Sequence, residues 1–178
     1  MTIGQPVVLV RWMVDREIAI CGVLNRISRP PIIKKVFVVI SRLGDGAAWF
    51  LLMMTLPLLY GEPGLTTCAS MIKVGLVNFV LYKIIKTFSA RHRPCAVSAA
   101  ITLSTPPLDQ YSFPSGHTMH AVAFSMIVMA HHPELAIVLI PFSSLIALSR
   151  VVLGLHFPTD VIAGGLIGGY VASTLLAS

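Results

Sequence analysis

The stretch LAIVLIPFSSLIALSRVV, residues 135–152, carries a single charged side chain, Arg150, close to its end. A helix that crosses the hydrocarbon core of a membrane needs about 20 predominantly apolar residues. Residues 161–177 form a second run of similar length and contain no charged residue at all. Runs of this kind are typical of transmembrane helices, and they predict a membrane protein.

The composition indicates the same class. Hydrophobic residues make up 56% of the 178-residue chain and charged residues 11%, whereas soluble domains are roughly 25% charged. Intrinsic disorder is excluded, because disordered chains combine low hydrophobicity with high charge. The three cysteines, Cys21, Cys68 and Cys95, are too few and too scattered to predict a disulfide framework or a zinc site.

Three further segments, residues 44–60, 65–85 and 116–130, are apolar enough to be predicted as spans. Residues 7–28 are helix-like, but four of their charges would lie near the centre of the membrane, where each would cost roughly 2.5–3.5 kcal/mol. These charges are Arg11, Asp15, Arg16 and Glu17. We therefore expect this helix to lie in the interface, with its charges among the headgroups.

The apolar side chains of that helix are expected to face the membrane surface; they include Val8, Trp12, Ile18 and Leu24. The sequence thus predicts an all-α, multi-pass membrane helix bundle with an interfacial N-terminal helix and about five transmembrane helices. Residues 1–178 are expected to form one domain, divided into an interfacial amphipathic segment (1–34) and a transmembrane bundle (35–178).

Counting the spans places three polar clusters on one side of the membrane. They are KTFSARHRP at residues 86–94, PSGH at residues 114–117 and SRVVLGLHFPTD at residues 149–160. Each cluster has an ordinary explanation when taken alone. Cations at the end of a span often reach for headgroups, Pro-Ser-Gly is a common start of a helix, and a His four residues before an Asp is often a structural pair.

Together the clusters supply what phosphoryl transfer requires. The transferring phosphoryl group carries negative charge on three equatorial oxygens, so fixed cations and hydrogen-bond donors are needed around it. Lys86, Arg93 and Arg150 provide the cations. Ser115 and Gly116 are expected at a helix start, where free backbone N–H groups and the helix dipole bind anions.

The two histidines of these clusters are suited to different parts of the reaction. Asp160 follows His156 by four residues, so its carboxylate can orient one ring nitrogen and stabilise the imidazolium while the other nitrogen attacks. His117 can protonate the departing oxygen and later activate water. We expect neither a metal nor another cofactor, because no acidic cluster is present to hold magnesium.

The patterns Lys-x6-Arg-Pro, Pro-Ser-Gly-His and Ser-Arg-x5-His-x3-Asp resemble the three motifs of the type 2 phosphatidic acid phosphatase (PAP2) superfamily. The resemblance covers roughly residues 35–170, and Ile40–Gly46 resembles the segment before the first full span of bacterial members. It implies a covalent phosphohistidine at His156, acid–base work by His117, and phosphate binding by six residues: Lys86, Arg93, Ser115, Gly116, His117 and Arg150. Many bacterial members have six spans, so this chain resembles a shortened form.

Some residues near the motifs keep open or minor roles. Ser149 either offers its hydroxyl to the phosphate or only fits its turn. Arg91 and His92, inside the first motif, are expected to meet lipid headgroups. Asp45 either belongs to the rim of the site or pairs with Arg42.

The resulting prediction is a metal-independent membrane phosphatase that hydrolyses a lipid phosphate or pyrophosphate. Phosphatidic acid, phosphatidylglycerol phosphate, undecaprenyl pyrophosphate and lipid A phosphates all fit. One alternative is a lipid phosphotransferase that uses the same site. A transporter or channel is a third reading, but it does not explain why the motif residues gather on one side.

The net charge of +6 is ascribed to anionic lipid headgroups and not to nucleic acid, because no nucleic-acid-binding motif is present. The bilayer and its lipid phosphate are the expected partners. The pairs Gly164/Gly168 and Gly165/Gly169 predict close helix packing, within a monomer rather than across a dimer. All of the 13 lysines and arginines except Lys73 are placed on the side of the polar clusters.

That charge bias favours a cytoplasmic site at a bacterial inner membrane. The periplasmic face is the alternative, because similar bacterial proteins often work there.

Overall fold

The computed structural model describes residues 5–178, and its side chains from Trp12 onward. Within this range the regular structure is entirely helical. The α-helices are α1 (Gln5–Asn25), α2 (Pro31–Arg42), α3 (Ala48–Tyr60), α4 (Glu62–Ser89), α5 (Pro94–Val97), α6 (Gly116–His131), α7 (Ala136–Val152) and α8 (Pro158–Leu176). Short helical turns of other types lie at Arg26–Ser28 (η1), Leu43–Ala47 (η2) and Pro133–Leu135 (η3).

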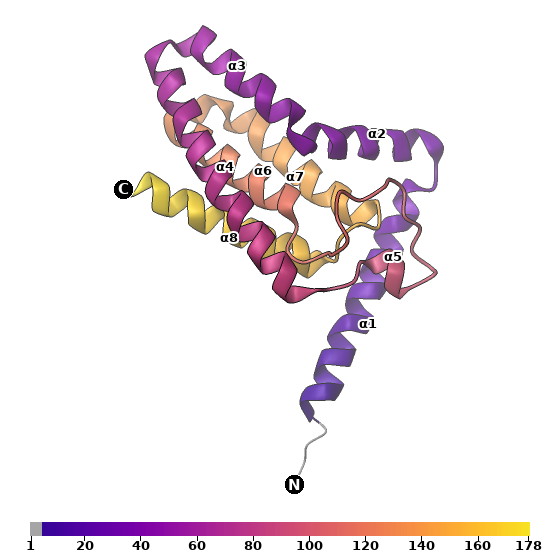
Figure 1. Ribbon diagram of the computed structural model, residues 1–178. Coiled ribbons are helices and arrows are strands. Elements are labelled where there is room, and N and C mark those ends of the chain that lie inside the picture. The colour runs from indigo at the N-terminus through magenta and orange to yellow at the C-terminus, as the bar shows by residue number, and fades with distance from the viewer. Residues whose placement is uncertain (1–4) are drawn as a thin grey trace.

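Over residues 5–178, four helical segments are long and apolar enough to cross a membrane: Pro31–Tyr60, Glu62–Val97, Pro133–Val152 and Pro158–Leu176. The predicted all-α membrane bundle is confirmed, and four of the five predicted spans correspond to these segments. The fifth predicted span, residues 116–130, corresponds to α6, whose 16 residues rise about 24 Å. This helix lies among α4, α7 and α8 (Figure 1).

Helix α2 joins α3 at the π-helical turn η2, with a kink at Gly46, so the apolar segment Pro31–Tyr60 consists of two helices. The predicted span of residues 44–60 corresponds to η2 and α3. The predicted boundary between residues 34 and 35 falls inside α2. Gly46 in η2 has a φ of 137°, a conformation that glycine adopts without steric cost. The extra residue of this turn turns Asp45 toward α6, where its carboxylate meets His117.

Helix α1 is joined to the bundle by its C-terminal half. The Asn25 side chain donates to Thr102 O and Val152 O, both at 2.9 Å, and accepts from Thr102 N at 2.9 Å. Ile18 and Leu24, which were expected to face the membrane surface, pack instead against a cluster around the buried Phe157. Trp12 is exposed, and the start of α1 extends away from the bundle (Figure 1). Asn25 thus anchors α1 to the loop after α5 and to the end of α7.

Helices α6 and α8 approach each other at backbone distance. A Cβ atom added to Gly164 would lie 2.5 Å from Ser115 O, and one added to Gly168 would lie 2.1 Å from Met119 O. The predicted packing of this glycine pair within one chain is therefore confirmed. The approach sets the start of α6 beside the start of α8, where Ser115 N donates to Asp160 O at 2.9 Å.

We predict that Gly168→Ala destabilises the protein by about 1–3 kcal/mol, because the backbone of α6 has to move away from the new methyl group. Gly165→Ala is the matched control on the same helix, since its Cβ would meet only side-chain methyl groups at 3.8 and 3.9 Å. Thermal unfolding of both variants in one detergent measures the difference. Equal melting temperatures would contradict the close approach.

Candidate active site

The three polar clusters converge on one cavity of about 360 Å³ between η2, α3, α4, α6 and the two loops that precede α6 and α8. Six of the residues singled out from the sequence line it: Lys86, Arg93, Gly116, His117, Arg150 and His156. Ser115 and Asp160 are completely buried behind this lining. The structure thus brings together residues that are up to 70 positions apart in the sequence.

His156 lies in the loop between α7 and α8 and is 2% exposed. Its Nε2 is 3.4 Å from Arg93 Nη1, an N–H donor, which suits an unprotonated Nε2. Burial, followed by the positive charges of Arg150, Arg93 and Lys86, holds the pKa of His156 well below its usual range. The imidazole is therefore neutral at neutral pH, as a nucleophile must be.

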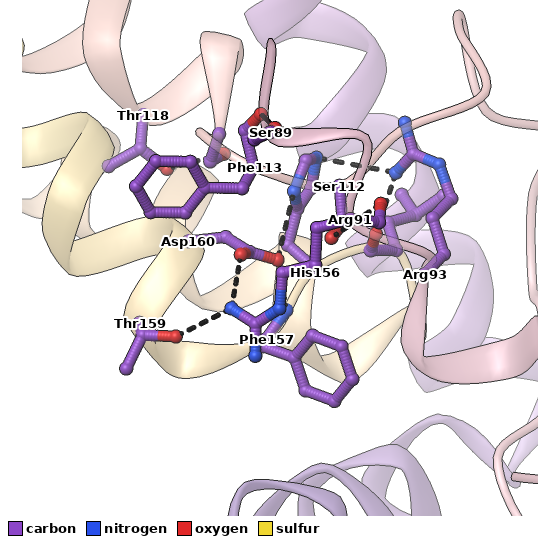
Figure 2. A network of polar contacts seen from close by, with 12 residues as sticks. Ser89, Arg91, Arg93, Ser112, Phe113, Thr118, His156, Phe157, Thr159 and Asp160 are labelled. Atoms are coloured by element: carbon purple, nitrogen blue, oxygen red, sulfur yellow. Dashed lines mark hydrogen bonds and ion pairs between the residues drawn. The ribbon is translucent and has the colours of Figure 1, made fainter. Parts of the chain in front are cut away.

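Asp160 stands near the other ring nitrogen of His156. Its Oδ2 is 3.7 Å from His156 Nδ1, which is longer than a hydrogen bond, and the same oxygen accepts from Phe157 N at 2.8 Å. The Asp160 carboxylate thus lies beside His156 as predicted (Figure 2), although Nδ1 makes no hydrogen bond. Catalytic hydrogen bonds are often long before substrate binds.

The three predicted phosphate-binding cations are all buried, with exposures of 3–5%. Arg93 Nη1 donates to Leu155 O at 2.6 Å, which fixes the guanidinium beside His156. Arg150 donates to the Ser41 hydroxyl of α2. Buried cations without enough counter-charge attract an anion strongly, because little water screens them.

A carboxylate of the protein itself occupies this cation cluster. Asp109 Oδ1 lies 2.7 Å from both Lys86 Nζ and Arg93 Nη2, and Asp109 Oδ2 accepts from the Tyr82 hydroxyl. Burial alone would raise the pKa of Asp109, but the hydrogen bonds from Lys86 and Tyr82 outweigh burial and lower it. Asp109 therefore stays ionised and marks where an anion binds.

The start of α6 differs in part from the expectation. Ser115 precedes the helix, but its N–H is used by Asp160 O and its hydroxyl pairs with Thr118 at 3.0 Å. The free N–H groups of this helix start therefore come from Gly116 and the residues after it. A Cβ on Gly116 would lie 2.9 Å from the Tyr82 ring, so the narrow cavity requires glycine there.

His117 stands across the cavity with a carboxylate partner that the sequence left undecided. Its Nε2 contacts Asp45 Oδ1, while Asp45 Oδ2 accepts from Arg42 Nη1 at 3.1 Å. Asp45 therefore fulfils both roles that were considered for it. Among residues 12–178, no group of three or more His, Cys, Asp or Glu side chains is arranged to hold a metal ion.

The model of the PAP2 superfamily matches residues 63–178 of this chain, which include all three motifs. The chain belongs to the PAP2 superfamily. The crystal structure of LpxE from Aquifex aeolicus is similar to it, with a TM-score of 0.78 and 28% identity over 90% of this chain and 94% of the other. A phosphatidylglycerolphosphate phosphatase of the PAP2 type from Bacillus subtilis shares the fold, with a TM-score of 0.64 and 24% identity over 99% and 96% of the two chains.

Curated PAP2 relatives are similar over shorter stretches. Decaprenylphosphoryl-5-phosphoribose phosphatase of Mycobacterium tuberculosis is 36% identical over 56% of this chain and 54% of its own length. Undecaprenyl-diphosphatase of Sulfolobus acidocaldarius is 32% identical over 54% and 48%. Lipid A 1-phosphatase of Rhizobium etli is 26% identical over 80% and 70%. The matched stretch thus spans about half the length of the first two relatives.

Ser149 and Arg91, two further motif residues of this PAP2 protein, differ in how their positions compare with the expectation. Ser149 donates to Ile146 O at 2.6 Å within its own helix and lies outside the cavity lining, which favours the structural role that was left open. Arg91, expected among lipid headgroups, points inward and bonds to Asp160 and Glu17. The spacing of the motif does not reveal whether the Arg91 side chain points inward or toward lipid headgroups.

We predict that Asp109→Asn tightens the binding of orthovanadate about 10-fold, because the displaced side chain no longer carries a charge that competes for Lys86 and Arg93. Isothermal titration of the detergent-solubilised protein measures the dissociation constant. Asp15→Asn, an exposed change on α1, is the matched control and should leave it unchanged. Weaker binding by Asp109→Asn would mean that the carboxylate holds the cations in place instead of competing with the ligand.

Proposed function

We propose that this chain is a membrane-embedded phosphatase that hydrolyses a lipid phosphate or pyrophosphate through a phosphohistidine at His156. One observation carries the proposal. A buried neutral imidazole, with Nε2 toward Arg93, shares a single cavity with three buried cations and a second histidine. This arrangement supplies a nucleophile, charge stabilisation and an acid–base group for phosphoryl transfer.

In the first step, the lone pair of His156 Nε2 attacks phosphorus and the bond from phosphorus to the lipid oxygen breaks. Lys86, Arg93 and Arg150, with the N–H groups at the start of α6, stabilise the charge on the equatorial oxygens. Asp160, 3.7 Å from Nδ1, stabilises the positive charge that develops on the ring. His117 donates a proton to the departing oxygen, and the contact with Asp45 offsets part of the cost of protonating this buried ring.

In the second step, His117 takes a proton from a water molecule, whose oxygen attacks the phosphorus of the phosphohistidine. The bond between phosphorus and Nε2 breaks, inorganic phosphate is released, and His156 returns to its neutral form. Asp109 has to leave Lys86 and Arg93 before either step, since a phosphate and a carboxylate cannot share these donors.

The lining of the cavity supports a lipid substrate. Beyond the cations it contains the aromatic side chains of Trp49, Phe79 and Phe124, which suit an acyl or prenyl chain. Each of the curated relatives named above is called a phosphatase or diphosphatase of a lipid. We propose that residues 1–178 act as one catalytic domain, because α1 is bonded to the loop and helix that flank the site.

We further propose that the site faces the cytoplasm from a bacterial inner membrane. The ends of α4 and α7 and the starts of α6 and α8 meet at the site, and the sequence predicts nearly all of the lysines and arginines on this side. The turns on the other side, at Gly61 and at η3 (Pro133–Leu135), contain no lysine or arginine. The positive-inside rule favours the cytoplasm for the side that carries the cations.

The reaction is tested by phosphate release from a panel of phosphatidic acid, phosphatidylglycerol phosphate, undecaprenyl pyrophosphate and lipid A. His156→Ala should abolish turnover, since no nucleophile remains, and His117→Ala should lower kcat about 10²–10⁴-fold. The wild-type rate should survive EDTA, and vanadate should inhibit as a transition-state mimic.

The matched control is His131→Ala, an exposed histidine at the other end of α6 from His117, which should retain full activity. Turnover by His156→Ala, or a wild-type rate that EDTA removes and magnesium restores, would contradict the mechanism. A wild-type chain inactive on the whole panel would contradict the proposed function itself.

The orientation is tested by reporters fused after Ser178, at the end of α8 away from the site. We predict that an alkaline phosphatase fusion is active and that a green fluorescent protein fusion is not fluorescent. A cytoplasmic site places the C-terminus on the periplasmic side of the membrane. A fluorescent, phosphatase-inactive fusion would move the site to the periplasmic face.

A further inference from the structure

Both carboxylate oxygens of Asp160 are used, although the motif assigns this residue to His156 alone. Oδ2 faces His156 and accepts from Phe157 N. Oδ1 accepts from Arg91 Nη1 at 2.7 Å (Figure 2). Asp160 is completely buried, and a buried carboxylate without a partner would protonate or turn away. Arg91 is therefore the cation that favours the ionised form of Asp160 and holds its Oδ1 in place.

Arg91 is itself held on several sides. Its Nη1 also donates to the Thr159 hydroxyl at 2.8 Å, and its guanidinium lies 4.2 Å from the centre of the Phe157 ring (Figure 2). Its backbone carbonyl accepts from Ser112 N at 2.8 Å. The guanidinium is thus held at the start of α8, and the Arg91 backbone is bonded to the loop before α6, so the side chain has little freedom to follow lipid headgroups.

The counter-charge of Arg91 comes from α1. Glu17 Oε2 accepts from Arg91 Nη2 at 2.5 Å, and Glu17 Oε1 accepts from Thr159 N at 3.0 Å and from the Thr159 hydroxyl at 2.6 Å. The Glu17 side chain is only 12% exposed. It lies outside residues 63–178, the stretch that matches the family model.

The charges along this chain of contacts explain why Glu17 matters for chemistry. Arg91 and Asp160 alone form a neutral pair, which offers little stabilisation to a developing imidazolium. With Glu17 the set has a net charge of −1, and its Asp160 end points at His156 Nδ1. Coulomb interactions act strongly in such a buried setting, so Glu17 restores the negative potential that Arg91 cancels.

We propose that Glu17 and Arg91 are positioning residues that hold the Asp160 carboxylate ionised and aimed at His156, so that helix α1 completes the active site. This inference rests on the proposed function. If the inference holds, α1 contributes to turnover in addition to attaching the chain to the membrane.

The inference is tested by kcat and KM in mixed micelles, using the full chain and the lipid of the panel above that the wild-type chain hydrolyses fastest. Arg91→Ala should lower kcat at least about 10-fold while KM changes less than about threefold, because the lost contact acts on the nucleophile and not on the ground-state lipid. Arg91→Lys should recover part of kcat, since an ammonium reaches one carboxylate but cannot bridge two. Glu17→Gln keeps the shape, removes the charge, and should lower kcat about 3–10-fold.

A double-mutant cycle separates positioning from folding. When Asp160 is already Asn, Arg91→Ala should cost less than about threefold in kcat, because the group it positions has lost its charge. Arg29→Ala, an exposed cation between η1 and α2, is the matched control and should leave kcat and KM unchanged.

Three outcomes would overturn the inference. They are full additivity of Arg91→Ala and Asp160→Asn, a change in KM with kcat preserved, and a Glu17→Gln variant with wild-type kcat. Should Arg91→Ala fail to fold, Arg91→Lys and Glu17→Gln still decide the question. An inactive wild-type chain would instead overturn the proposed function, and this inference with it.

Discussion

The backbone contact between α6 and α8 is the constraint on which the site depends. Gly164 and Gly168 leave no room for a side chain against Ser115 O and Met119 O. Because the helices meet this closely, the motif at the start of α6 stands beside the motif at the start of α8, and Ser115 N bonds to Asp160 O. His117 and His156 consequently line the same cavity, although they come from different motifs. The close packing of α6 and α8 thus also determines the geometry of the site.

The second organising feature is a surplus of buried positive charge that the protein balances with its own carboxylates. Asp109 pairs with Lys86 and Arg93, and Glu17 and Asp160 pair with Arg91. Buried ion pairs are retained where a function requires the charge, since apolar packing would often be as stable. The two sets differ in one respect. Asp109 lies on a loop, and the proposed mechanism requires it to give way to a phosphate, whereas Glu17 and Asp160 lie on helices.

Much of this arrangement could be predicted from the sequence. Span counting alone places the three motifs on one side, and the resemblance to PAP2 proteins rests on spacings within short segments. Asp109 could not be predicted, because the loop from Val97 to Ser115 has no periodicity that fixes which side chain turns inward. Asp45 depends on the π-helical turn η2, which a pattern of apolar residues does not reveal. Glu17 and Arg91 are 74 positions apart, and only the tertiary fold brings them together.

Covalent catalysis at His156 is the central claim, and isolation of the intermediate tests it most directly. Phosphatidic acid labelled with ³²P in its phosphate is mixed with the enzyme and quenched in base within one turnover. The account predicts an acid-labile, alkali-stable label on His156 that is absent from His156→Ala. A label on another residue, or the same label in His156→Ala, would contradict it.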